Sequence, residues 1–185
     1  EADEDYQLAA GISKDVEADD SILEHTKARL PWLVLALLGG FISVKVLGLF
    51  EGAMLEHRNL FFFTPLIAAM AGNAGVQSSA IIVQGLANNS LSGSLFNRLV
   101  KEVALSLLNG LILAAILFIG SHFLLNVNYI IGVIITVALM SVIIIASLIG
   151  TFVPLLLNKF GIDPALATGP FITTSYDICP ILIYF

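Results

Sequence analysis

The chain has 185 residues, of which 58% are hydrophobic and only 12% are charged, and its mean hydropathy is +0.97. These values lie well outside the range of soluble globular domains and indicate an integral membrane protein. The single cysteine, Cys179, excludes an intrachain disulfide and a cluster of metal-binding thiolates. Any metal ligands are therefore expected to be oxygen atoms.

The formal net charge of −6 is concentrated at the N-terminus, because nine of the fourteen acidic residues lie in the first 24 positions. We expect residues 1–28 to be an acidic cytosolic linker, either merely solvated or serving as a surface that collects divalent cations. The sequence begins with Glu1 rather than Met and shows no signal peptide. We therefore expect further sequence upstream.

From residue 30 onward, apolar stretches follow one another, and each is near or above the ~20 residues that a helix needs to cross a bilayer. We predict five membrane spans, at about residues 30–50, 60–86, 103–125, 129–157 and 164–185. The stretches are continuous rather than alternating, which favours an all-α integral membrane protein over a barrel. Pro31 is expected in the first turn of the first span, and Asp163 is expected to cap the fifth, with Pro164 as its first helical residue.

The distribution of Lys and Arg predicts the orientation of these spans. With a cytoplasmic N-terminus, only Arg58 lies outside, and the remaining loop and tail cations lie inside: Lys14, Lys27, Arg29, Arg98, Lys101 and Lys159. We therefore expect a multi-pass protein of the cell (inner) membrane with an external C-terminus. Arg98 and Glu102 have the spacing of an ion pair on one helix face.

The second span combines small residues with amides. Ala68, Gly72, Gly75 and Ser79 fall close to one face, which predicts a close approach by a neighbouring helix. Asn73, Gln77 and Gln84 form a polar stripe beside that face. Helix packing accounts for the glycines, but it accounts less well for two amides one turn apart.

The fifth span carries one carboxylate, Asp177, inside an apolar segment. An ionised acid in a bilayer costs several kcal/mol, so such residues usually face a bundle interior or a water-filled path. The alternative is an Asp satisfied locally by the hydroxyl of Thr173 or Thr174. Spacings of three, four and seven predict a polar face that contains Asp177 and three further residues: Pro170, Thr173 and Tyr184.

Pairing this face with the amide stripe of the second span would line a passage with oxygen atoms. Backbone carbonyls left without a donor by Pro65 and Pro170 would add to the set. Hard oxygen ligands suit magnesium or calcium rather than copper or zinc. A twofold homodimer would supply a second copy of Asp177, and two carboxylates across an axis could hold magnesium through its water shell.

Two stretches of the sequence, residues 65–79 and 161–177, resemble the signature segments of the MgtE magnesium channel family, as does the closing Ile183-Tyr184-Phe185. The likeness extends over residues 29–185, and residues 1–5 resemble the acidic end of that family's cytosolic part. The resemblance implies a homodimer of five-helix protomers with its pore on the twofold axis, formed mainly by the second and fifth helices.

The same resemblance implies that hydrated magnesium is held by the acid matching Asp177, near the residue matching Asn73. The candidate metal-binding residues are therefore Asp177, Asn73, Gly72, Gln77, Thr173 and Gly169. Family members also carry cytosolic N and CBS domains and a connecting helix that closes the pore when cytosolic magnesium is high. The resemblance implies that the N and CBS domains lie outside the present sequence and that residues 1–28 are a linker or the end of the connecting helix. The pair Cys179-Pro180 departs from the family pattern, and Pro180 is expected to bend the outer end of the helix.

These observations predict a magnesium-selective channel that conducts hydrated Mg²⁺ into the cytoplasm, with Mn²⁺ and Co²⁺ as competing ions. One alternative is a proton- or sodium-coupled secondary transporter with Asp177 as the coupling site, although inverted repeats are not visible. A second is a membrane scaffold whose polar stripe only holds helices together. The spans contain no pairing of nucleophile and base, so we do not expect an enzyme. We also do not expect the protein to bind nucleic acid.

Overall fold

The computed structural model describes residues 7, 10–13, 16–91, 93–165 and 170–185, with side-chain positions from residue 173 in the last segment. Over these residues the regular structure is helical and contains no strand, as the sequence predicts. The helices are α2 (Ile22–Gly48), α3 (Glu51–Glu56), α4 (Arg58–Phe61), α5 (Thr64–Ala87), α6 (Leu95–Phe123), α7 (Tyr129–Lys159) and α8 (Pro170–Tyr184).

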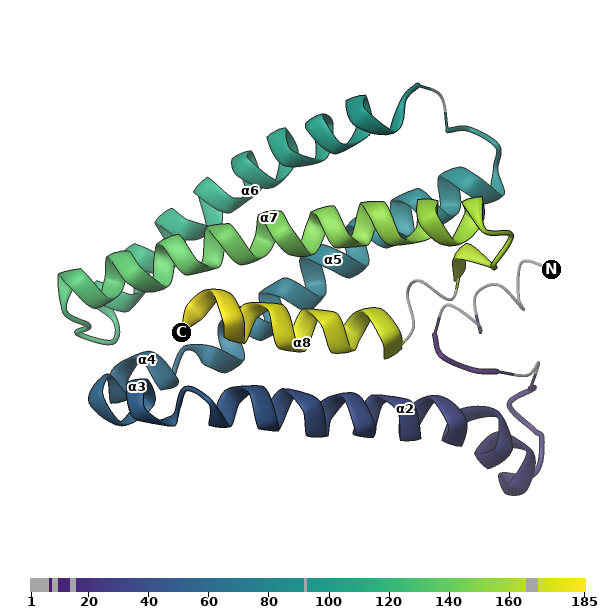
Figure 1. Cartoon of the computed structure of the whole chain (residues 1–185), viewed down its shortest axis with the longest axis horizontal. Coiled ribbons are helices and arrows are strands. Elements are labelled where there is room, and N and C mark those ends of the chain that lie inside the picture. The colour runs from purple at the N-terminus through teal and green to yellow at the C-terminus, as the bar shows by residue number, and fades with distance from the viewer. Residues whose placement is uncertain (1–6, 8–9, 14–15, 92, 166–169) are drawn as a thin grey trace.

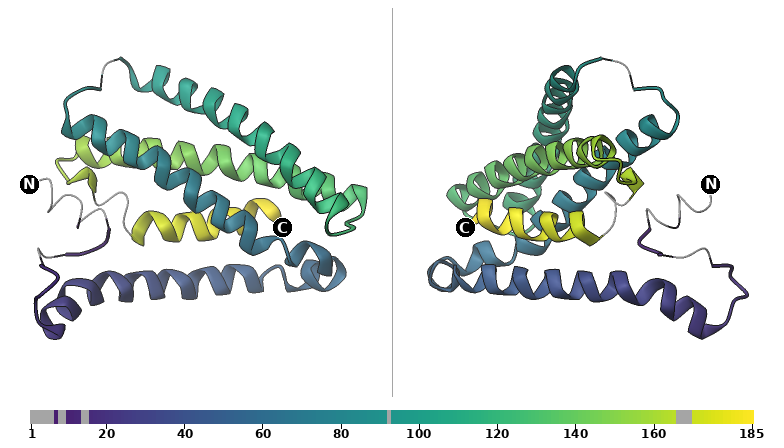
Figure 2. Two further views of the ribbon diagram at one scale, coloured as in Figure 1. Left: turned by 180° about the vertical axis from the view of Figure 1, so that it is seen from behind. Right: turned by 45° about the vertical axis from the view of Figure 1, so that its right-hand side comes forward.

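The long helices form an elongated bundle with α8 near its centre. Helix α7 packs against both α5 and α6, and α8 contacts α2, α5 and α7. Figure 1 shows α8 lying between α2 on one side and the α5–α7 pair on the other, and the two views of Figure 2 show the same order. The short helices α3 and α4 join α2 to α5 at one end of the bundle.

Four segments are long and apolar enough to cross a membrane: Ile22–Gly48, Arg58–Ala87, Leu95–Phe123 and Tyr129–Lys159. The described part of α8 has 15 residues, which corresponds to about 22 Å of helix at 1.5 Å per residue. A hydrocarbon core is ~30 Å thick. Four of the five predicted spans are thus confirmed by length and composition, and the fifth stays a prediction.

Helix boundaries follow from capping residues, and they differ from the predicted starts. At α2, the side chain of Ser21 accepts from the backbone N–H of Glu24, and the Glu24 carboxylate accepts from the N–H of Ser21 at 3.0 Å. This capping box starts the helix at Ile22, so Pro31 lies inside α2 and not in its first turn as predicted. Asp163 does cap a turn, because its Oδ1 accepts from the N–H of Ala165 at 2.8 Å, but residues 166–169 lie outside the described part of the chain.

The predicted span over residues 60–86 is divided near its start. The chain turns at residues 62–63, and α5 begins at Thr64 with Pro65 in its first turn. We expected Pro65 to leave a backbone carbonyl without a donor inside a continuous helix. It does not, because Pro65 lies in the first turn of α5, where a residue needs no intrahelical N–H bond. The carbonyl of Leu60 just upstream accepts two bonds, from the N–H of Phe63 at 3.0 Å and from the hydroxyl of Tyr184 at 2.7 Å.

The predicted close approach of a helix to α5 occurs at Gly75. A Cβ atom at Gly75 would overlap the ring of Tyr176 on α8, and a Cβ at Gly150 on α7 would overlap the carbonyl oxygen of Gly75. Three helices therefore meet at one level, and only residues without a side chain permit this spacing. Gly72, one turn earlier on α5, has open space around its Cβ position.

Candidate functional site

Asp177 lies on an exposed face of α8, although the same helix carries buried residues close to it. The Tyr176 side chain is 1% exposed, and Pro180 is also fully buried. Asp177 itself is exposed. Over the described chain, its carboxylate forms no hydrogen bond, so the alternative of an Asp satisfied by Thr173 or Thr174 is not observed. The chain thus presents a carboxylate at its surface on an apolar helix.

Contacts on both sides of Asp177 fix α8 in this orientation. Tyr176 inserts against Gly75 of α5, and Thr174 fills the space left by Gly39 of α2. At the end of the helix, Tyr184 is buried with its hydroxyl on the Leu60 carbonyl. We predicted Tyr184 on the same face as Asp177, but the exposure of that face changes along α8: the helix is covered at its C-terminal end, near α4, and not at the level of Asp177.

Of the remaining site residues predicted on the fifth span, only Thr173 has a described side chain. Thr173, one turn before Asp177, is exposed, as expected for a residue on the same face. Gly169 lies outside the described residues, and the side chain of Pro170 is likewise outside the description. In the described chain, no group of three or more His, Cys, Asp or Glu side chains is positioned to hold a metal ion. A cation bound at Asp177 would need water or a second chain to complete its ligands.

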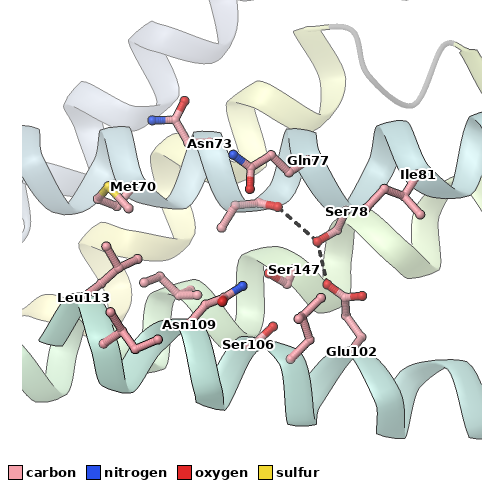
Figure 3. Close-up of a pocket in the computed structure, with 14 residues that line it drawn as sticks. Met70, Asn73, Gln77, Ser78, Ile81, Glu102, Ser106, Asn109, Leu113 and Ser147 are labelled. Atoms are coloured by element: carbon pink, nitrogen blue, oxygen red, sulfur yellow. Dashed lines mark hydrogen bonds between the residues drawn. The ribbon is translucent and has the colours of Figure 1, made fainter.

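The three predicted residues of α5 differ in their exposure. Asn73 and Gln77 are exposed and Gly72 is half-buried. Both amides line a cavity of about 400 Å³ between α5, α6 and α7. In Figure 3 the Asn73 amide projects from α5 away from α6, whereas Ser106 and Asn109 project from α6 toward α5.

Sequence reasoning did not identify the carboxylate of this cavity. Glu102 on α6 accepts a hydrogen bond from the hydroxyl of Ser78 on α5, with 2.6 Å between Oε1 and Oγ (Figure 3). The predicted pair of Glu102 with Arg98 is not formed among the described residues, because the carboxylate is turned toward α5. The spacing of Glu102, Ser106 and Asn109, at steps of four and three, was the signal of a polar face on α6.

Together, the long apolar helices, the surface carboxylate of α8 and the oxygen-rich cavity define a polytopic membrane protein with polar groups suited to hard cations. Residues 64–185 match the model of a family described as "MgtE: Divalent cation transporter". The chain belongs to the MgtE family, which is a family of membrane transporters for magnesium and not an enzyme family.

Similar proteins bear the name "Magnesium transporter MgtE". That of Bacillus subtilis is 37% identical over 186 residues, covering 100% of this chain and 41% of the relative. That of Enterococcus faecalis is 36% identical over 188 residues, covering 100% and 41%. That of Thermus thermophilus is 33% identical over 163 residues, covering 85% and 35%. The chain thus spans about two fifths of the length of the first two relatives.

Proposed function

We propose that this chain forms a homodimer that conducts hydrated Mg²⁺ down its electrochemical gradient through a pore on the twofold axis, with Asp177 of each protomer facing that axis. The observation that carries this proposal is the exposure of Asp177 beside the buried Tyr176 and Pro180. A charged Asp facing lipid at the centre of a helix costs about 2.5–3.5 kcal/mol or more. The surface of α8 around Asp177 therefore requires water or a protein partner.

A second copy of the same chain is the simplest partner for this surface. A twofold interface places the same patch of both subunits face to face, so it pairs Asp177 with its own equivalent. Two carboxylates that repel one another in the apo state become a favourable site when a divalent cation lies between them. Magnesium fits because it keeps most of its waters and is usually bound through only one or two carboxylates.

The remaining predicted residues line the path to this site in our proposal. Thr173 adds a hydroxyl one turn from Asp177 on the same exposed face. Asn73 and Gln77 offer amide oxygens on α5, beside Gly72, and α5 packs against α8. Gly169 would contribute its carbonyl oxygen. We further propose that the N-terminus is cytoplasmic, because the Lys and Arg residues then fall largely on the inner side.

Flux measurements in liposomes test the proposal. We expect Mg²⁺ to enter liposomes containing the chain along its gradient without any proton or sodium gradient, and Mn²⁺ and Co²⁺ to reduce this flux by competition. Asp177→Asn keeps the shape of the side chain and removes its charge, and it should lower flux about 10–100-fold, as expected for a group that holds a metal through water. Glu56→Gln, at an exposed position outside α8, is the matched control.

The alternatives give different results in the same assay. Flux that stops when a proton or sodium gradient is absent would indicate a coupled secondary transporter. Undiminished flux in the Asp177→Asn protein would remove this residue from the conduction path. Chains that remain monomeric in lipid nanodiscs while conducting would overturn the dimeric pore.

A further inference from the structure

The cavity between α5, α6 and α7 has the chemistry of a second ion site. Its volume is about 400 Å³, and its polar lining comes from three helices: Asn73, Gln77 and Ser78 of α5, Glu102, Ser106 and Asn109 of α6, and Ser147 of α7. The lining contains one carboxylate, several amide and hydroxyl oxygen atoms, and no Lys, Arg, His or Cys. This set disfavours an anion and a soft metal, and it favours a hard cation.

Glu102 is held in place but retains ligand capacity. Its Oε1 lies 2.6 Å from the Ser78 hydroxyl, which itself lies 3.0 Å from the Ala74 carbonyl of the preceding helical turn. The second carboxylate oxygen forms no hydrogen bond within the described chain. A carboxylate has about four lone-pair sites, so most of the accepting capacity of Glu102 remains for a cation or its waters.

A second observation points independently to an occupant. The hydroxyl of Ser106 lines the cavity one turn beyond Glu102, its residue is only 2% exposed, and it has no hydrogen-bond partner among the described residues. Buried hydroxyls in proteins are nearly always bonded to protein or to ordered water. Figure 3 shows Ser106 projecting from α6 into the space between α5 and α6. A bound water belonging to a cation shell would satisfy this group.

The size of the cavity distinguishes a hydrated ion from a bare one. Six waters at ~30 Å³ each occupy about 180 Å³, so a six-coordinate hydrated ion fits within the cavity with room for further water. Magnesium characteristically keeps several waters and uses one or two carboxylates. Amides and hydroxyls such as those of Asn109 and Ser147 can then contact the water shell rather than the ion itself.

We propose that the α5–α6–α7 cavity is a binding site for a hydrated divalent cation, with Glu102 as its carboxylate and Ser106 as a hydrogen-bonding partner of the ion's water shell. The site lies within a single protomer, so it needs no second chain. It does not depend on the axial position of Asp177 and is tested separately from it.

Electron paramagnetic resonance of Mn²⁺, used alone as the probe, tests the site on the full chain in lipid nanodiscs. In the Asp177→Asn background we expect one class of bound Mn²⁺ per chain, displaced by excess Mg²⁺. Adding Glu102→Gln should weaken that binding at least tenfold, and adding Ser106→Ala should weaken it several-fold. Adding Glu56→Gln instead should leave it unchanged.

The Ser106→Ala protein keeps the test decisive if Glu102→Gln disturbs folding. Removing a hydroxyl without a partner does not remove a bond within the chain, so this variant should keep the thermal stability of its parent. The proposal is overturned if the Asp177→Asn chain binds no Mn²⁺, or if its binding is the same with and without Glu102→Gln. Loss of Mg²⁺ flux in Asp177→Asn with persistent Glu102-dependent binding would support both sites separately.

Discussion

Replacing Gly75 by Ala tests whether the crossing of α5, α7 and α8 fixes the helix that carries Asp177. The added Cβ would overlap the Tyr176 ring, which is fully buried. Gly72→Ala is the matched control, because it lies one turn earlier on α5 and its Cβ would meet no atom within 4 Å.

Two opposing effects decide the stability of each variant. Gly to Ala within a helix gains about 0.8–1 kcal/mol from backbone entropy and propensity. Overpacking of a tight interior typically costs about 1–3 kcal/mol. We therefore expect Gly72→Ala to be neutral or stabilised and Gly75→Ala to be less stable than Gly72→Ala by about 1–3 kcal/mol. At about 2–4 °C per kcal/mol for a chain of this size, a difference of ~2 kcal/mol separates their melting temperatures by about 4–8 °C.

Thermal unfolding in detergent, followed by the fluorescence of a thiol dye at Cys179, measures this difference. The Gly75→Ala/Tyr176→Leu double variant should recover part of the loss, because the smaller side chain makes room for the new methyl group. Equal melting temperatures for Gly75→Ala and Gly72→Ala would show that α8 does not press against α5 at this level. The account of how Asp177 is positioned would then be wrong.

Two further substitutions address the other contacts of α8. Tyr184→Phe removes the hydrogen bond to the Leu60 carbonyl. It should lower the free energy of unfolding by about 0.6 kcal/mol and by at most about 1.7 kcal/mol, the average and the largest value for such bonds within membranes; a stability in denaturant equal to that of the parent chain would contradict it. Gly39→Ala places a Cβ against Thr174 and should be less stable by about 1–3 kcal/mol than Gly40→Ala, whose Cβ meets no atom within 4 Å. Indistinguishable melting curves for these two alanine variants would exclude a tight α2–α8 contact.

The sequence predicts the helices well because long apolar runs have few other ways to satisfy their backbone in a bilayer. It also predicted that small residues of α5 would meet a neighbouring helix, and Gly75 and Ser79 are indeed buried. It did not predict the partners, Gly150 and Tyr176, because pairing between distant segments is absent from local periodicity.

Periodicity also failed where the surroundings of a helix change along its length. Asp177 and Tyr184 are seven residues apart and share a face, yet one is exposed and the other is buried. The pattern gives the direction of a side chain but not what covers it at each level. For the same reason, Glu102 was assigned to Arg98 by spacing on its own helix, whereas its hydrogen bond reaches Ser78 on another.

The meeting of α5, α7 and α8 at Gly75, Gly150 and Tyr176 locks three helices together at one level. Backbones this close cannot slide along one another without collision, because a densely packed interior leaves no room for added atoms. Asp177 directly follows Tyr176, so the position of the exposed carboxylate is tied to this contact. A substitution that enlarges either glycine is therefore expected to displace Asp177 as well as to destabilise the bundle.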